Sequence, residues 1–178
     1  MKQVGKEEGV RTTGIPSKEE LEASPGYPNR EALERGPIVV IECVQDIPCN
    51  PCEMACPKGA IRIGNPITQL PVFYAERCDG CGRCIPICPG QAIFRVDITY
   101  AEDKATVSFP YEFLPMPKKG DMVQGVNRAG KTVCEAEVLR VQKPKKFAHT
   151  AVITVTVPKG LSMEVRSIKR NHESPFST

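Results

Sequence analysis

The chain has 178 residues, with 24 Lys and Arg against 21 Asp and Glu, a formal net charge of +3 and nine cysteines. This length suits one domain or two small ones, and two fit better because the cysteine motifs end at residue 88. No apolar run approaches the roughly 18 residues that a membrane span needs, and no signal segment opens the chain. We therefore expect a cytoplasmic protein without a membrane span.

Residues 1–36 form a polar N-terminal arm that has too few large apolar groups to build its own core. We expect a partner to order this arm, with a disordered tail as the alternative. Two short helices are predicted within it. Ser17 and Glu20 form a capping box before the first, and Asn29 caps the second, which runs from residue 30 to 35.

Two cysteine runs follow the arm, over residues 43–57 and 78–89. The second has the spacing C-x2-C-x2-C-x3-C-P, which wraps a [4Fe–4S] cluster and points its last cysteine to a second cube. The first run supplies that second motif as C-x5-C-x2-C-x3-C-P. Eight thiolates for two cubes are therefore predicted.

The two runs are internal repeats, because a shift of 32 residues superposes the last three cysteines of the first run on those of the second. Each repeat is expected to form a strand, a cluster loop, a short helical turn and a second strand. The predicted strands cover residues 37–42, 60–63, 72–75 and 92–96. Four apolar side chains between them are expected to cover the cubes, namely Ile47, Met54, Ile85 and Ile87.

One ligand of the first cube departs from the repeat. Asp46 aligns with Cys78, and the thiol occurs three positions earlier as Cys43. Either Cys43 closes the first cube from a lengthened loop, or Asp46 supplies a carboxylate and Cys43 stays free. We favour Cys43, because such cubes are normally held by four thiolates.

Zinc and disulfides are the other uses of such cysteines. Two C-x2-C pairs can hold a structural zinc ion, but four thiols would remain unused. Dense C-x2-C runs in a cytosolic protein favour metal or redox chemistry over disulfides.

Residues 38–96 resemble the bacterial two-cluster ferredoxins. The resemblance implies an α+β fold, a ferredoxin-like two-cluster module of pseudo-twofold ββ/α repeats that share ligands crosswise. By this resemblance the first cluster is held by Cys43, Cys49, Cys52 and Cys88. The second cluster is held by Cys56, Cys78, Cys81 and Cys84.

From about residue 99 the pattern changes to short strands separated by turn signals, which predicts a small all-β barrel over 99–170 and a tail over 171–178. The expected strands cover residues 105–109, 111–114, 121–126, 132–141, 150–157 and 163–168. Residues 100–178 carry thirteen basic against eight acidic groups. With a two-cluster domain over 37–98, this basic half favours a fixed docking surface.

The remaining candidates are isolated. Cys134 lies in a strand pattern and is expected to be a buried structural thiol. His149 and His172 form no catalytic constellation. The basic run at residues 143–147 is interpreted as a solvated turn, with contact to an acidic partner or to nucleic acid as the less favoured alternatives.

No phosphate loop, activated nucleophile, or flavin or nicotinamide fingerprint occurs in the sequence, so substrate chemistry is expected on another subunit and no catalytic residue here. We predict an iron–sulfur subunit of a multi-subunit oxidoreductase, working anaerobically, that relays single electrons through two [4Fe–4S] clusters from or to a flavin-bearing partner. The layout resembles small subunits of heteromeric flavin-dependent amine or amino-acid dehydrogenases of the proline or hydroxyproline type. The alternatives are a free ferredoxin shuttle and a cluster-braced module that binds nucleic acid or protein.

Overall fold

The computed structural model describes residues 9–143 and 150–169. The helices are α1 (Val10–Thr13), α2 (Lys18–Ala23), α3 (Arg30–Glu34), α4 (Pro51–Ala55), and the 3-10 turns η1 (Ala75–Arg77) and η3 (Lys159–Leu161). The strands are β1 (Ile38–Ile41), β2 (Ile61–Arg62), β3 (Val72–Phe73), β4 (Ile93–Asp97), β5 (Lys104–Tyr111), β6 (Met122–Val126), β7 (Thr132–Gln142), β8 (Ala151–Pro158) and β9 (Ser167–Ile168). Most of the regular structure is β, with few and short helices. In the described ranges, none of the helices combines the length and apolar content needed to cross a bilayer.

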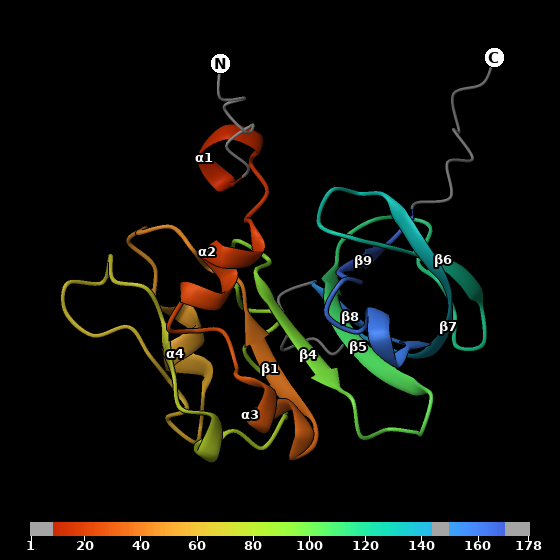
Figure 1. The fold of residues 1–178 in the computed structure, drawn as a ribbon, viewed down its shortest axis with the longest axis horizontal. Coiled ribbons are helices and arrows are strands. Elements are labelled where there is room, and N and C mark those ends of the chain that lie inside the picture. Colours follow the sequence, from red (N-terminus) through yellow and green to blue (C-terminus); the bar gives the residue numbers. More distant parts are fainter. Residues whose placement is uncertain (1–8, 144–149, 170–178) are drawn as a thin grey trace, which may run out of the picture.

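Residues 9–36 form three short helices on one half of the molecule (Figure 1). The Ser17 Oγ accepts a hydrogen bond from the Glu20 N–H at 3.2 Å, and the Glu20 carboxylate accepts one from the Ser17 N–H at 2.8 Å. Asn29 caps α3 in a similar way, so both predicted helix starts are confirmed. Leu21 is buried. This part of the arm packs against its own chain, and its ordering by a partner stays a prediction.

The two repeats exchange their strands. β1, from the first repeat, pairs antiparallel with β4, from the second. β2 and β3, the inner pair, form a separate two-stranded sheet. Because each of these two strand pairs combines one strand from each repeat, the two cysteine runs are held next to each other around a common core.

A single sheet of seven strands runs through both halves of the chain, in the order β1-β4-β5-β8-β7-β6-β9. β4 and β5 pair directly, with Asp97 opposite Thr106. The edges of this sheet, within the described residues, are β1 and β9, so the closed barrel expected over 99–170 does not form there. β9 curls back toward β5, but β4 already occupies the free edge of β5.

Two strand predictions in this half need correction. The strand expected at 111–114 is absent as a separate element, because β5 continues to Tyr111 and the chain then turns. Pro115 and Pro117 follow, and proline lacks the N–H that a sheet ladder requires. The strand expected at 163–168 is reduced to Ser167–Ile168. The division of the chain at residues 98 and 99 stays a prediction.

The antiparallel strand pair β1–β4 separates two hydrophobic cores. Val40, Phe94 and Val96 face the larger core, which the curled part of the sheet encloses. Val39 and Ile93 face the opposite way, into a second core that contains cysteines from both runs. Since alternate residues of a strand face opposite sides, this one strand pair supports the cysteine loops on one face and the curled sheet on the other.

Candidate metal centre

Six of the eight cysteines in the two runs belong to the second core or pack against it, and Cys49 and Cys81 are the two that do not. Cys52 and Cys84 are buried, at 8% and 5% exposure, and Cys81 is exposed. The other five are half-buried. All nine cysteines of the chain are free thiols, so none of the predicted ligands is consumed by a disulfide.

Four thiols lie close enough to influence one another at one end of this core. We call them thiol group 1: Cys43, Cys49, Cys52 and Cys88. Burial, and then the charge of Cys88, raises the pKa of each of the other three, to about 11 for Cys52. A thiol must lose its proton before it binds a metal. Metal binding here therefore releases protons.

The other four thiols line one cavity (thiol group 2): Cys56, Cys78, Cys81 and Cys84. Burial, and then the charges of Cys78 and Cys81, raises the pKa of Cys84 well above its usual range. Apolar surface of Val39, Ala60 and Ile61 also lines the cavity, together with the charged residues Lys58, Asp79 and Arg83. Each thiol group thus takes three cysteines from one repeat and one from the other.

Backbone N–H groups point at two sulfurs of thiol group 2. The Ala60 N–H donates to the Cys56 Sγ at 3.2 Å, and the Gly80 N–H donates to the Cys78 Sγ at 3.4 Å. Thiol group 1 also has backbone contacts, because a hydrogen bond with the Glu53 backbone partly offsets the rise in the pKa of Cys52, and the Cys43 thiol donates to the Gln45 carbonyl at 3.9 Å. Hydrogen bonds to sulfur stabilise negative charge there and are a main control of iron–sulfur reduction potentials.

The donor set fits an iron–sulfur cluster better than a single ion in one respect: a cube spreads its thiolates over different irons. Over residues 9–143 and 150–169, no three Cys, His, Asp or Glu side chains converge on a site for one metal ion. The assignment of individual ligands stays a prediction. Asp46 is exposed, and its charge is the smallest of the named effects on the pKa of Cys43, so Cys43 stays the predicted fourth ligand of the first cube.

The apolar cover expected over the cubes forms only in part. Ile85 is buried, at 1% exposure, and packs in the second core. Ile47, Met54 and Ile87 are exposed, at 43%, 78% and 43%. These three side chains therefore lie on the surface of the cysteine loops.

Sequence reasoning missed a buried charge network directly before Cys43. Glu42 is buried at the end of β1, and its carboxylate accepts hydrogen bonds from Arg166 at 2.7 Å and from the Arg128 Nε at 2.8 Å. A second nitrogen of Arg128 also donates to Glu42. The Arg166 guanidinium lies 4.9 Å from the centre of the Phe94 ring. The sequence signal for this network was Glu42 itself, an acidic residue at the end of the otherwise apolar strand predicted over residues 37–42.

Asp79 is a second missed residue. Its carboxylate accepts a hydrogen bond from the Cys81 N–H at 3.1 Å, which shapes the turn between Cys78 and Cys81. Hydrogen bonds from Cys81 hold the pKa of Asp79 below its usual value. The Asp-Gly pair at 79–80 is a turn signal that could have indicated this role.

The remaining sequence candidates lie away from the two thiol groups. Cys134, expected to be a buried thiol, is half-buried and packs on the larger core, and partial burial raises its pKa; its structural role stays a prediction. Lys143 is exposed. The rest of the basic run, together with His149 and His172, lies outside the described residues.

Comparisons with known proteins agree with this site. Residues 43–99 match the LdpA Fe-S cluster-binding domain. The chain is 43% identical over 47 residues to one subunit of an ion-translocating oxidoreductase complex from Methanosarcina acetivorans, which covers 26% of the chain and 17% of that relative. It is 30% identical over 129 residues to Protein Pixie of Drosophila melanogaster, covering 61% of the chain and 21% of Pixie.

A third relative is covered almost completely. The chain is 34% identical over 71 residues to the ketoisovalerate oxidoreductase subunit VorC of Methanothermobacter marburgensis, covering 38% of the chain and 90% of VorC. No solved structure matches the chain. The chain is thus an iron–sulfur, electron-transport protein, and it belongs to the family of oxidoreductase subunits that includes VorC.

Proposed function

We propose that the chain holds two [4Fe–4S] clusters and relays single electrons between a flavin-bearing catalytic partner and a further acceptor or donor. Thiol group 1 would hold cluster 1 and thiol group 2 would hold cluster 2. The observation that carries this proposal is the division of eight thiols into two sets of four, each drawing one thiol from the other repeat.

Each cluster supplies one-electron redox chemistry when bound. The residues of the chain set the conditions for it. The N–H groups of Ala60 and Gly80 donate to sulfurs of thiol group 2 and so favour the reduced, more negative state of cluster 2. Val39, Ile61 and the buried Ile85 keep water from the inner side of the thiols.

The flavin-bearing partner is proposed because the sequence contains no recognised catalytic or flavin-binding motif, and because its layout resembles small subunits of flavin-dependent dehydrogenases. VorC and the Methanosarcina relative are both named as subunits of oxidoreductases. The chain covers less than a quarter of the Methanosarcina relative and of Pixie, so their whole activities are not transferred. We retain the layout of a two-cluster domain at 37–98 and an assembly domain at 99–170. Free thiols suit the reducing cytoplasm.

Anaerobic purification with the chain's native partners tests this function. We expect about eight irons per chain, a co-purifying flavoprotein, and cluster absorbance that bleaches when the substrate of that flavoprotein is added. Four irons would contradict the two-cluster proposal. A chain that holds eight irons but elutes alone, and exchanges electrons with several unrelated enzymes, would instead be a free shuttle.

A further inference from the structure

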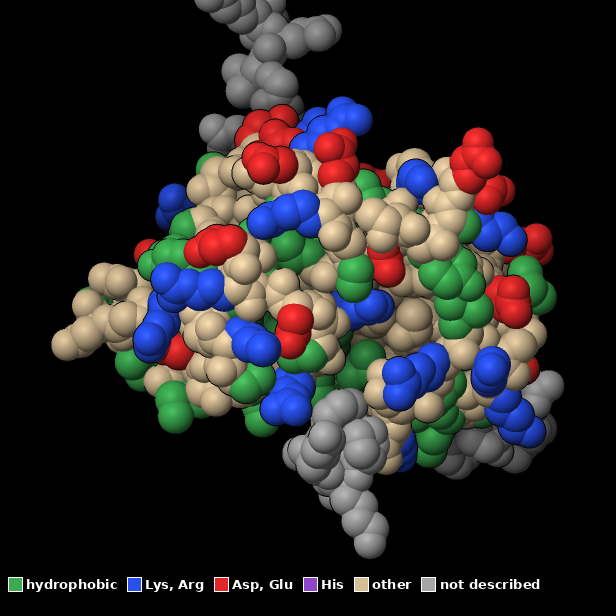
Figure 2. Space-filling view, turned by 90° about the horizontal axis from the view of Figure 1, so that it is seen from below, with side chains coloured by type: hydrophobic (Ala, Val, Ile, Leu, Met, Phe, Trp, Pro, Cys, Tyr) green, Lys and Arg blue, Asp and Glu red, His purple; other side chains and the backbone are tan. Residues whose placement is uncertain are grey.

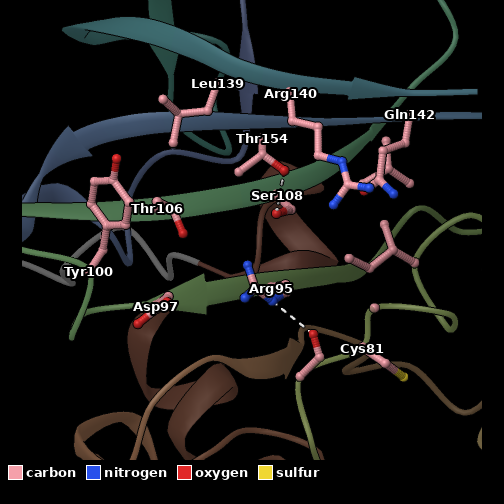
Figure 3. A pocket seen from close by; sticks show the side chains of 14 residues that line it. Cys81, Arg95, Asp97, Tyr100, Thr106, Ser108, Leu139, Arg140, Gln142 and Thr154 are labelled. Carbon is pink, nitrogen blue, oxygen red and sulfur yellow. Dashed lines mark hydrogen bonds between the residues drawn. The ribbon is translucent and has the colours of Figure 1, made fainter.

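A polar groove lies on the outer face of the sheet, next to the loop of thiol group 2 (Figure 3). Its floor is a row of four residues from four adjacent strands. Arg95 pairs with Ser108, Ser108 with Thr154, and Thr154 with Arg140. We call this the arginine groove. It has an arginine at each end of the row and two hydroxyl groups between them.

The row depends on an irregularity in β7. Val138 faces the larger core and pairs with Val155, so strict alternation would turn Arg140 toward the core as well. The register shifts between Val138 and Arg140, with Leu139 as the extra residue. A bulge of this kind reverses the side of the following residues. Arg140 therefore faces outward, over the row.

The two arginines are placed to hold a negative group between them. Their backbones are separated by three strand spacings, roughly 14 Å, and Figure 3 shows both side chains extending into the space between the strands. The Ser108 and Thr154 hydroxyls, 2.9 Å apart, are hydrogen-bonded to each other beneath it. Within the described residues Arg140 has no hydrogen bond or ion pair, and Arg95 bonds only to the Gly80 carbonyl, at 2.8 Å.

The neighbouring row on the same face has the opposite charge. Asp97 pairs with Thr106, Thr106 with Thr156, and Thr156 with Glu137. Asp97 itself lines the groove. A ligand would thus meet basic groups over one row and acidic groups over the next. This pattern fixes the orientation of a polar segment, and electrostatic complementarity of this kind favours specific and rapid association.

The groove adjoins thiol group 2 directly. Cys81 and Gly82 line both the groove and the cavity of thiol group 2. In Figure 3 the Cys81 sulfur points away from the two arginines. A segment bound in the groove would be separated from cluster 2 by this loop alone, which is the position that a redox partner must reach.

We propose that the arginine groove is the docking site for an acidic segment of a redox partner protein, which places that partner beside cluster 2. This inference rests on the proposed function. Charge complementarity favours this occupant, because two guanidiniums without a carboxylate in the described chain match Asp or Glu side chains. Figure 2 shows Lys and Arg side chains spread over both halves of the face in view, so net attraction alone would not select the groove.

The first test measures binding of a fluorescent hexaglutamate peptide to the anaerobic holoprotein by anisotropy at low salt. Arg140→Glu should weaken binding at least about threefold and Arg95→Gln/Arg140→Gln about tenfold. A control variant, Lys18→Gln/Arg30→Gln, removes the same net charge as the double variant from exposed positions on the arm and should change binding little. Equal loss in this control, or hexalysine binding as tightly, would overturn the proposal.

Small anions separate the two sources of a negative group. Glutarate and inorganic phosphate should compete with hexaglutamate only weakly. Competition at matched or lower concentration would mean a small-molecule site and would overturn the partner-docking assignment. Arg140 is the decisive position, since its side chain has no bond in the described structure whose loss could disturb the fold.

A second measurement links the groove to cluster 2. Reduced holoprotein passes one electron to each ferricyanide anion or hexaammineruthenium(III) cation. Arg140→Glu should slow oxidation by the anion about threefold relative to the cation. An unchanged ratio would overturn the link. Iron content is measured on the same samples, so loss of clusters, which is a failure of the proposed function, is distinguished from loss of docking.

Discussion

Thiol group 1 and thiol group 2 are built from two copies of one sequence repeat, yet they lie in different surroundings. Thiol group 2 accepts two backbone N–H bonds and lines a cavity that adjoins the arginine groove. Thiol group 1 contains the relocated Cys43, which directly follows the buried Glu42 and its two arginines. The Cys43 carbonyl also accepts a hydrogen bond from the Ser24 hydroxyl of the arm at 3.2 Å.

The different surroundings indicate that the two thiol groups have different roles. The surroundings of thiol group 1 connect the cysteine loops to the arm and, through Arg128 and Arg166, to the second half of the chain. The surroundings of thiol group 2 are open toward a charged groove. We infer that cluster 1 contributes more to the integrity of the assembly, while cluster 2 faces the exchange of electrons with a partner.

Removal of a buried ligand should have the largest effect. Cys84→Ser should eliminate cluster 2 and lower the iron content from about eight to about four per chain, measured by iron analysis after anaerobic purification. Cys134→Ser is the matched control, because that thiol packs on the larger core, away from both groups, and its iron content should stay unchanged. Iron loss in both variants would contradict the grouping.

The relocated ligand gives a sharper test of the difference. Cys43→Ser should remove cluster 1 and leave about four irons, whereas Asp46→Asn should leave about eight, because Asp46 is exposed and would not be a ligand. The opposite result would assign the carboxylate as the ligand and leave Cys43 free. Electron paramagnetic resonance of each reduced variant identifies the cluster that remains.

The buried charge network should dominate the stability of the cluster 1 side. Glu42→Gln leaves Arg166, whose side chain is 4% exposed, without its buried counter-charge. Removing one partner of a buried ion pair costs about 3–5 kcal/mol. Glu34→Gln breaks an exposed helical pair with Arg30 and should cost less than about 0.5 kcal/mol. Urea unfolding followed by circular dichroism measures both.

If Glu42→Gln and Glu34→Gln unfold at the same urea concentration, the two halves of the chain are not joined by this network. A decrease confined to cluster 1 content, without global destabilisation, would place the role of Glu42 in the geometry of Cys43 instead. Both results would weaken the contrast between the two thiol groups.

The loop of thiol group 2 has its own steric constraint. Gly80 has a φ of +66°, and a Cβ there would collide with the Pro37 carbonyl. Gly80→Ala should cost more than about 1 kcal/mol and lower the occupancy of cluster 2. Gly90→Ala, just after the last cysteine of the same run, meets no atom within 4 Å and should be neutral. Iron content and urea unfolding check both variants, and equal behaviour would refute the constraint.

Local signals predicted much of this structure. The capping residues Ser17 and Asn29 and most of the strands follow from short-range spacing, whereas the assignment of the cysteines to two clusters comes from the ferredoxin resemblance and stays a prediction. The rest depends on distant contacts. Glu42 and Arg166 are 124 residues apart. The β4–β5 pairing, which keeps the expected barrel from closing, depends on which edge of β5 is free. The bulge at Leu139 reverses the side that Arg140 and the following residues face, and it leaves no clear mark in the sequence.

The arm should show the smallest effect, and it tests whether a local signal alone orders a segment beside thiol group 1. Ser17→Ala removes the cap of α2, which costs about 1 kcal/mol, while Ser17→Asp retains an acceptor for the Glu20 N–H. Hydrogen exchange of residues 18–23 should accelerate about fivefold in the alanine variant only, because the loss is local. Equal exchange in all three proteins would mean that packing of the buried Leu21, and not the capping box, holds the arm against the sheet.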